Sequence, residues 1–436
     1  MSGRKTSTED KEDFIGSKIH IFESEKLGEG SYGAVYRCCN DSGDCFAVKC
    51  VSCTNVGIPS ILESSIMRTI FHPNLNTAIH IHSNTEDIHI FQKMAKTDLA
   101  RHTRSLKKPV SPSLLKKWSF EIVQGLACLH RQHIIHGDVK ASNVLLFEDQ
   151  SVKLGDFTLS VIVKEPFEKL GEMGSKPLSA NDAEPRKLFT HRVCTYSHRP
   201  PECWMERGWS YPLDIWSLGC TLFEIAYGKY LFPGQGKITD QESKSEIYDR
   251  ALRCLVDWAK NGPNATDAPF WIKDVEFLEE KEFNRATLPS DWKNPEYRCF
   301  NKLLLWMLKV DPLQRPTIDE ILKHEYFAGL KPQSYKIKST PCKTLPRKER
   351  KRLVKYLEGI KNLWIRDLAL ELYSRCSTLK SISEKLKISA CIWIASKLNR
   401  IRPDDRGIPR KLLLESERRI CQHLSFRLYI PSSAIC

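Results

Sequence analysis

Hydrophobic and polar positions near the start of the chain follow two different periods. Residues 21–39, IFESEKLGEGSYGAVYRCC, alternate around a glycine-rich centre, which predicts two strands joined by a tight turn. A further strand is predicted at residues 45–50, CFAVKC. In residues 57–75 the period changes to three and four, with apolar residues at Ile61, Leu62, Ile66, Met67 and Ile70. This period predicts a helix after the strands.

The rest of the chain is dominated by helical patterns. Residues 211–228, YPLDIWSLGCTLFEIAYG, are apolar enough to predict a long buried helix. After Phe327 the sequence becomes polar and contains prolines, which predicts a linker. Helical spacing then returns in residues 353–376, 379–400 and 410–431. The predicted boundaries are a flexible N-terminus at 1–17, a large domain at 18–328, a linker at 329–346 and a helical domain at 347–436.

The composition indicates the compartment in which the protein is expected. The 436 residues contain no apolar run long enough to span a membrane, and the polar first residues do not form a secretory signal, so we expect a cytoplasmic or nuclear protein. The 16 cysteines are then expected to be reduced thiols, and the single pair Cys50 and Cys53 supplies only half of a structural zinc site.

Positive charge is concentrated at the end of the chain. The net charge is +14, and residues 329–436 contain 25 Lys and Arg against 9 Asp and Glu. The preceding residues are therefore nearly neutral, with 42 basic and 44 acidic side chains. Such a basic module either binds an acidic partner or nucleic acid, or is a solvated face without a target.

A glycine motif and a lysine indicate phosphate binding. Gly28, Gly30 and Gly33 remove side chains so that backbone amides can approach phosphates. The motif alone also fits a dinucleotide fold, but a second strand carrying Lys49 follows where that fold requires a helix. Glu63 on the predicted helix is suited to hold the Lys49 ammonium group.

The segment IIHGDVKASNVLL at residues 134–146 resembles the catalytic loop of protein kinases, and LGDFTLS at 154–160 resembles the metal-binding segment that follows it. The resemblance extends over residues 18–328 and implies an α+β two-lobed kinase fold, with an N-lobe of about 18–94 and a C-lobe of about 95–328. It also implies a buried ion pair between Glu202 and Arg315, and an Asp214 that holds the backbone of the catalytic loop.

The kinase resemblance assigns roles to single residues. Asp138 would be the catalytic base, Lys140 would neutralise the γ-phosphate, and Asn143 and Asp156 would bind Mg²⁺. ATP and Mg²⁺ are the implied cofactors. The implied ATP-binding residues are Gly28, Glu29, Gly30, Ser31, Tyr32, Gly33, Val35, Ala47, Lys49, Glu63, Lys93, Ala95, Asp98, Asn143, Leu145 and Asp156.

Within the kinases, the motifs GEGSYGAVY, GIPS and LFPG resemble those of cyclin-dependent kinases. This likeness makes Ser31, Tyr32 and Thr190 candidate regulatory phosphorylation sites. That family binds the activating phosphothreonine with three arginines, and here Leu62, Gly137 and Val161 stand at their positions. A phosphate orders a loop only where cationic groups pair with it, so we expect activity that does not depend on Thr190 phosphorylation.

Two further features distinguish this chain. Thr158 replaces the glycine of the kinase D-F-G motif, and its β-branch is expected to stiffen the segment. The C-terminal segments ISACIWIASKLNR and LLLESERRICQHLSFRLYIPS resemble part of a cyclin box. This likeness implies a small all-α cyclin-like domain in which Lys397 and Glu417 contact the kinase.

The predicted function is ATP-dependent phosphorylation of serine and threonine in proteins, with activation by the attached cyclin-like domain or by an external cyclin. The first alternative is an ATP-binding pseudokinase that acts as a scaffold. The second is a kinase that recruits a separate cyclin and binds nucleic acid through its basic tail. No membrane partner is expected.

Overall fold

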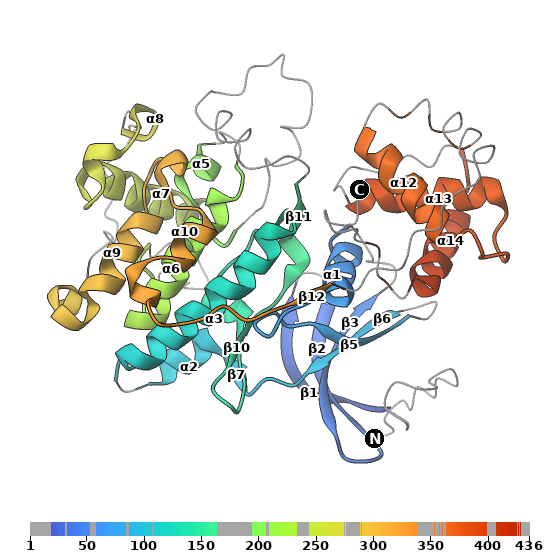
Figure 1. The fold of residues 1–436 in the computed structure, drawn as a ribbon, viewed down its shortest axis with the longest axis horizontal. Helices are drawn as coiled ribbons and strands as arrows, with labels where there is room; N and C mark the ends of the chain where they lie inside the picture. The colour runs from blue at the N-terminus through green and yellow to red at the C-terminus, as the bar shows by residue number, and fades with distance from the viewer. Residues whose placement is uncertain are drawn as a thin grey trace. The chain divides into compact units, whose positions relative to one another are not determined.

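The computed structural model shown in Figure 1 forms two compact units. The first unit comprises residues 1–72, 76–95 and 335–436, and the second comprises residues 73–75 and 96–334. The structure describes residues 19–30, 33–52, 58–83, 87–106, 108–163, 194–205, 209–232, 244–273, 275, 288, 290–337, 353, 357, 360, 363–398, 407–424, 426 and 428.

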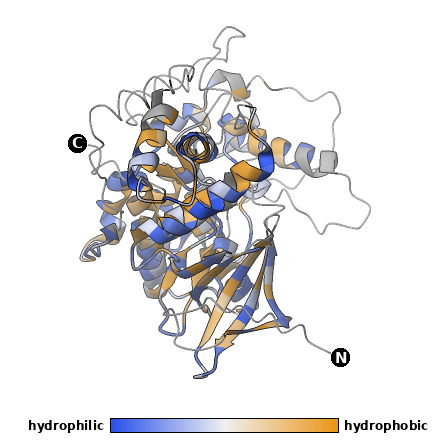
Figure 2. Cartoon of the chain, turned by 90° about the vertical axis from the view of Figure 1, so that its right-hand side faces the viewer, coloured by the Kyte–Doolittle hydropathy of each residue, from blue (hydrophilic) through white to orange (hydrophobic). Residues whose placement is uncertain are grey.

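An antiparallel five-stranded sheet forms the core of the first unit, with strand order β1-β2-β3-β6-β5. Its strands are β1 (Ile19–Gly30), β2 (Gly33–Asn40), β3 (Cys45–Ser52), β5 (Ala78–Ser83) and β6 (Asp87–Lys93). Figure 2 shows that hydrophobic and hydrophilic positions mix along these strands. One face of the sheet buries Cys38, Val48 and Phe91, so the alternation seen in the sequence separates two faces.

Helix α1 (Ile58–Thr69) follows β3 and runs directly into the short strand β4 (Ile70–Phe71). Its apolar side chains Ile61, Leu62, Ile66 and Met67 are all nearly fully buried. The helical period of the sequence predicted this face. The helix packs against β5, which anchors it to the sheet.

Three helices of the C-terminal region belong to the same unit: α12 (Leu363–Arg375), α13 (Glu384–Leu398) and α14 (Arg410–His423). Helix α13 packs against both α12 and α14, and it also contacts α1. Residues 387–398 of α13 are buried on every side, which is the condition of a central helix. The predicted helical region is therefore present.

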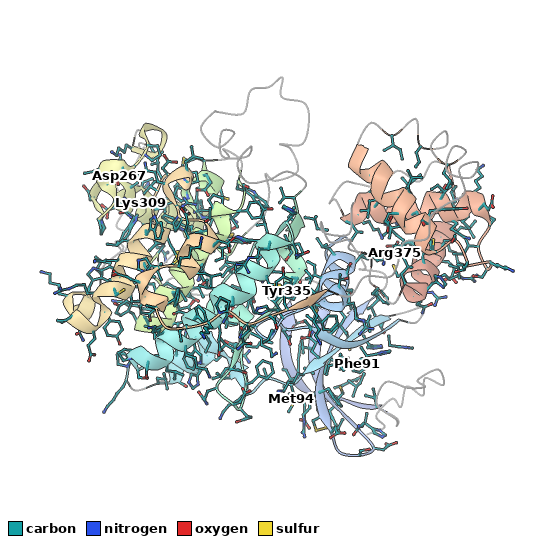
Figure 3. All side chains as sticks on the ribbon, viewed as in Figure 1. Phe91, Met94, Asp267, Lys309, Tyr335 and Arg375 are labelled. Atoms are coloured by element: carbon teal, nitrogen blue, oxygen red, sulfur yellow. A yellow bond between two sulfur atoms is a disulfide. The ribbon has the colours of Figure 1, made fainter. Side chains whose placement is uncertain are left out.

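A short strand within the predicted linker also belongs to this unit. Strand β12 (Lys336–Ile337) pairs with β4 in antiparallel register, Lys336 opposite Phe71 and Ile337 opposite Ile70. The ring of Tyr335, labelled in Figure 3, lies 6.1 Å from that of His72. The segment predicted as a linker therefore contains a short strand, whose backbone groups are paired with those of β4.

The second unit is mainly helical. Its longer helices are α2 (Leu99–Ser105), α3 (Pro112–Arg131), α6 (Pro212–Tyr227), α7 (Lys244–Asn261) and α9 (Arg298–Met307), and its shorter ones are α5 (Pro201–Trp204), α8 (Phe270–Lys273) and α10 (Ile318–Leu322). Helix α6 is the buried helix predicted at 211–228, with all residues from Pro212 to Ala226 buried.

Short strands and 3₁₀ turns of the second unit carry most of the predicted chemistry. One sheet has the order β10-β9-β7 and another pairs β11 with β8. These strands are β7 (Thr97–Asp98), β8 (Ile134–Ile135), β9 (Val144–Leu146), β10 (Val152–Leu154) and β11 (Val161–Ile162). The 3₁₀ turns are Ala141–Asn143, Phe157–Leu159, Tyr196–His198, Ala265–Asp267, Ser290–Lys293, Pro295–Tyr297, Pro312–Gln314 and Glu325–Phe327.

A buried ion pair ties distant parts of the second unit together. The guanidinium of Arg315 donates to both carboxylate oxygens of Glu202, at 2.7 and 2.8 Å. Neither side chain is more than 2% exposed. The predicted pair is confirmed. Lys309 and Asp267, labelled in Figure 3, form a second and more exposed ion pair in this unit.

The cysteines do not all behave as expected. Cys39 and Cys45 form a disulfide, so the prediction of reduced thiols is wrong for this pair. The two residues are directly opposite in the β2–β3 register, which brings their Cα atoms to 4.2 Å. Cys50 is a free thiol, and Cys53 lies outside the described residues.

Among the described helices, none has the length and apolar character needed to span a bilayer.

Candidate functional site

Lys49 and Glu63 form a buried ion pair in the first unit. The Lys49 ammonium donates to both carboxylate oxygens of Glu63, at 2.8 and 2.7 Å. Lys49 comes from the middle of β3, opposite Val35 in β2 and Ile90 in β6. The Glu63 side chain is only 2% exposed, so α1 must be in place for the pair to form. The predicted contact is confirmed.

The glycine motif forms the β1–β2 hairpin. Glu29 pairs with Ala34, and Gly30 pairs with Gly33. A Cβ atom at Gly33 would clash with the carbonyl oxygen of Cys50, whereas one at Gly28 would meet nothing within 4 Å. Close packing on β3 therefore requires a glycine at position 33.

Other predicted nucleotide-binding residues occupy defined positions in their own units. Ala47 is buried in β3, and Lys93 and Ala95 lie at the end of the segment 76–95 of the first unit. In the second unit Asp98 caps α2 by accepting a hydrogen bond from the Arg101 amide at 2.8 Å, and it pairs with Leu145 in the β7–β9 ladder. The candidate phosphorylation sites Ser31, Tyr32 and Thr190 lie outside the described residues.

Asp138 is the centre of a hydrogen-bond network in the second unit. Its Oδ2 atom accepts from the Lys140 ammonium at 2.7 Å and from the Asn143 amide at 3.3 Å. Its Oδ1 atom accepts from the backbone amide and the hydroxyl of Thr195, both at 3.0 Å. Lys140 also donates to the Thr195 hydroxyl at 3.0 Å. The structure thus brings Asp138, Lys140 and Asn143 together, and it adds Thr195, which sequence reasoning missed.

The backbone before Asp138 is fixed by Asp214 of α6. Asp214 is fully buried and accepts hydrogen bonds from the amides of His136 at 2.7 Å and Gly137 at 2.9 Å. Its Oδ2 atom also accepts from His130 at 2.9 Å. The predicted role of Asp214 as the anchor of this loop is confirmed. Its role was expected from the resemblance to protein kinases.

Gly137 adopts a backbone conformation that other residues rarely take. Its φ angle is +80°, and an added Cβ atom would lie 2.6 Å from the carbonyl oxygen of Leu159. Its own carbonyl accepts hydrogen bonds from the amide of Cys194 at 3.0 Å and from its thiol at 3.2 Å. Burial raises the pKa of the Cys194 thiol well above its usual range, and the Asp138 carboxylate adds to this effect. The thiol therefore stays protonated and remains a donor.

Asp156 begins the next segment and is exposed. It has a left-handed backbone with φ of 59° and ψ of 74°. The preceding residue, Gly155, connects it to the loop at residues 134–146, because its amide donates to the Asn143 carbonyl at 2.9 Å and its carbonyl accepts from the His136 ring at 3.0 Å. The hydroxyl of Thr158 donates to Oδ1 of Asp156. Neither the His136 bridge nor the Thr158 contact was predicted.

The oxygen atoms offered here suit a magnesium ion. The Asn143 amide nitrogen donates to Asp138, and in the described part of the chain no donor reaches its Oδ1 atom. The Asp156 carboxylate is exposed, and a backbone hydrogen bond through Gly155 links it to Asn143. Mg²⁺ is commonly held by one or two protein oxygens together with substrate phosphates. These two side chains fit that requirement.

Lys397 and Glu417 meet each other in the C-terminal helices. The Lys397 ammonium donates to both Glu417 oxygens, at 2.8 and 2.7 Å, and the Trp393 indole donates at 3.0 Å. Both charged side chains are only 5% exposed. Burial raises the pKa of Glu417, and the Lys397 charge opposes that shift. Their predicted contact with a kinase stays a prediction, as does nucleic-acid binding by the basic tail.

Comparison with known families agrees with the site. A family model described as a protein kinase domain matches residues 22–327, more than two thirds of the 436 residues. The match includes both the Lys49–Glu63 pair and the network around Asp138.

Proposed function

Because the chain belongs to the protein kinase family, we propose that it transfers the γ-phosphate of ATP to serine and threonine hydroxyls of proteins. The kinase domain supports phosphotransfer, and the acceptor class is part of the proposal. The observation that carries it is the Asp138 network, in which a nearly buried carboxylate is held by Lys140, Asn143 and Thr195. Such fixed positioning is what phosphoryl transfer requires of a protein.

In this proposal each charged group has one task. Asp138 orients the acceptor hydroxyl and takes its proton, and Lys140 stabilises the charge on the transferred phosphoryl group. Lys49 binds the α- and β-phosphates while Glu63 keeps its ammonium in position. Asn143 and Asp156 would hold Mg²⁺, which supplies charge neutralisation at the β- and γ-phosphates when bound. The described residues retain all six side chains.

The test is phosphate transfer by the purified full-length chain. We expect the wild type to label a protein acceptor from γ-labelled ATP, and Asp138→Asn or Lys49→Met to reduce transfer by several orders of magnitude. Lys302→Met is the matched control, since Lys302 is exposed and only loosely paired with Glu325 at 3.5 Å. Nucleotide binding by the wild type without any transfer would favour the pseudokinase alternative.

We further propose that the helices α12–α14 form a cyclin-like domain that activates the kinase within the same chain. Two contacts support this idea. Helix α13 packs against α1, which carries Glu63, and β12 extends the chain backbone along β4 at the end of α1. Both contacts restrain the helix on which the Lys49–Glu63 pair depends. The buried Lys397–Glu417 pair supports a fixed orientation of α13 relative to α14.

A cleavable linker tests whether the kinase domain needs the attached helices for its activity. A site-specific protease sequence inserted after residue 343 leaves every described element intact. Uncleaved protein should have a specific activity that does not change on dilution, because the attached domain has a high effective concentration. After cleavage, we expect the specific activity to fall on dilution as the two pieces separate. Gel filtration measures this separation. Unchanged activity of the separated kinase piece would contradict activation by these helices.

We also propose that activity does not require phosphorylation of Thr190. The three positions that would supply arginines hold Leu62, which is fully buried, Val161, which is buried in β11, and Gly137. Instead, Cys194 and Thr195 are held directly by Gly137 and Asp138. Thr190→Ala should therefore keep its activity within a few-fold of the wild type, whereas a near-complete loss would refute the idea.

A further inference from the structure

Thr158 places a hydroxyl group on the candidate metal ligand. Its side chain is buried, at 6% exposure, and its Oγ1 atom donates a hydrogen bond to Oδ1 of Asp156. The backbone of Thr158 is not among the positive-φ positions of the described residues, so this position does not require glycine. The threonine therefore adds a donor without straining the chain.

The backbone around Asp156 is already fixed, whereas its carboxylate is exposed. Phe157 is fully buried with its ring edge-on to His136 at 5.6 Å, and the Ser160 amide closes the turn on the Phe157 carbonyl at 3.0 Å. These contacts fix the Cα position of Asp156, and the Thr158 hydroxyl contacts its carboxylate. A buried β-branched residue has few χ1 rotamers, so the Thr158 hydroxyl is a donor of fixed direction.

We propose that Thr158 is a positioning residue that orients the Asp156 carboxylate toward its cation, an inference that rests on the proposed function. By engaging Oδ1, the hydroxyl sets the plane of the carboxylate and thereby the direction of Oδ2. Partners of this kind around metal-ligating side chains typically change metal affinity by about 10- to 100-fold when removed. The threonine that replaces glycine at position 158 thus holds the Asp156 carboxylate in a fixed orientation for its cation.

Three variants of the full-length chain test this role. Thr158→Val keeps the size and the β-branch but removes the donor, and Thr158→Ser keeps the donor but removes a methyl group. Thr103→Val is the matched control, because Thr103 is also 6% exposed and, among the residues that the structure describes, its hydroxyl bonds only backbone carbonyls of α2. Thermal melting of each variant establishes that it is folded.

The main readout is binding of Mn²⁺ in the presence of ADP, followed by electron paramagnetic resonance. We expect Thr158→Val to raise the dissociation constant for Mn²⁺ by about 10-fold or more, while Thr158→Ser and Thr103→Val stay within about threefold of the wild type. ADP binding without metal should be unchanged in all three variants. The Mg²⁺ concentration needed for half-maximal phosphate transfer should rise in parallel for Thr158→Val.

Failure of this inference differs from failure of the proposed function. If Thr158→Val binds Mn²⁺ as tightly as the wild type, or if Thr158→Ser is as weak as Thr158→Val, Thr158 does not position Asp156 through its hydroxyl. Asp156→Asn tests the underlying assumption. If that variant binds Mn²⁺ with ADP as well as the wild type, Asp156 is not the metal ligand and the proposed function loses its metal site.

Discussion

Replacing Gly137 by alanine adds only one methyl group, but it should strongly disturb the catalytic loop. At φ of +80°, an L-residue costs roughly 1–2 kcal/mol more than glycine. The new Cβ atom would also lie 2.6 Å from the Leu159 carbonyl oxygen, so the backbone must shift. Relief of such overpacking costs roughly 1–3 kcal/mol, which gives a total loss of stability of about 2–5 kcal/mol.

The shift should also reduce catalysis, because Gly137 immediately precedes Asp138. Its amide is held by Asp214 at 2.9 Å and its carbonyl by Cys194 at 3.0 Å, so a movement of the loop displaces the Asp138 carboxylate. Misplacement by about 1 Å can cost on the order of 100-fold in rate. We expect a loss of this order in kcat/KM, measured with labelled ATP, and the loss of stability by urea unfolding.

Gly329→Ala is the matched control for this experiment. Gly329 has a φ of +84°, nearly that of Gly137, but an added Cβ atom would meet nothing within 4 Å. This variant should lose only the conformational part, about 1–2 kcal/mol, and keep its activity. Equal stability losses in the two variants, or full activity of Gly137→Ala, would falsify the argument from close packing. Gly137→Arg should behave like Gly137→Ala and should not create dependence on a loop phosphate.

Two further predictions concern stability. Arg315→Met should destabilise the second unit by about 3–5 kcal/mol, because it leaves the buried Glu202 carboxylate without its partner, and urea unfolding should detect this. Arg131→Met, which breaks a pair that is 43% and 50% exposed, should cost less than about 1 kcal/mol and is the control. Cys39→Ser should lower stability by about 2 kcal/mol under non-reducing conditions, since the disulfide closes a loop of sequence separation 6. Dithiothreitol should remove the difference in stability between this variant and the wild type. If that difference persists in dithiothreitol, the Cys39–Cys45 disulfide is not its cause.

Much of the site was predictable because its chemistry is carried by motifs that are short in sequence. Asp138, Lys140 and Asn143 fall within six residues, so any fold that forms this loop keeps them close. The Lys49–Glu63 pair was predictable from the order of strand and helix. Thr195 was not, because it is 57 residues from Asp138 and its only local signal is a common residue type.

The disulfide and β12 were missed for a related reason. Cys39 and Cys45 face each other only once the hairpin register is set, and a shift by one residue would separate them. Strand β12 consists of two polar or β-branched residues in a proline-bearing segment, and only its pairing with β4 makes it a strand. Neither feature has a periodic pattern of its own.

The sequence by itself predicted the kind of chemistry: which side chains are candidates to bind phosphate and metal, and which segments form the main helices and strands of the kinase domain. These properties depend on residue type and short spacing, which folding does not alter. The tertiary structure decided which remote residues contact these side chains. Only packing brings the Leu159 carbonyl against Gly137, the Thr158 hydroxyl against Asp156, and helix α13 against α1. Contacts of this kind depend on backbone direction and on distances between remote residues, and no local pattern encodes them.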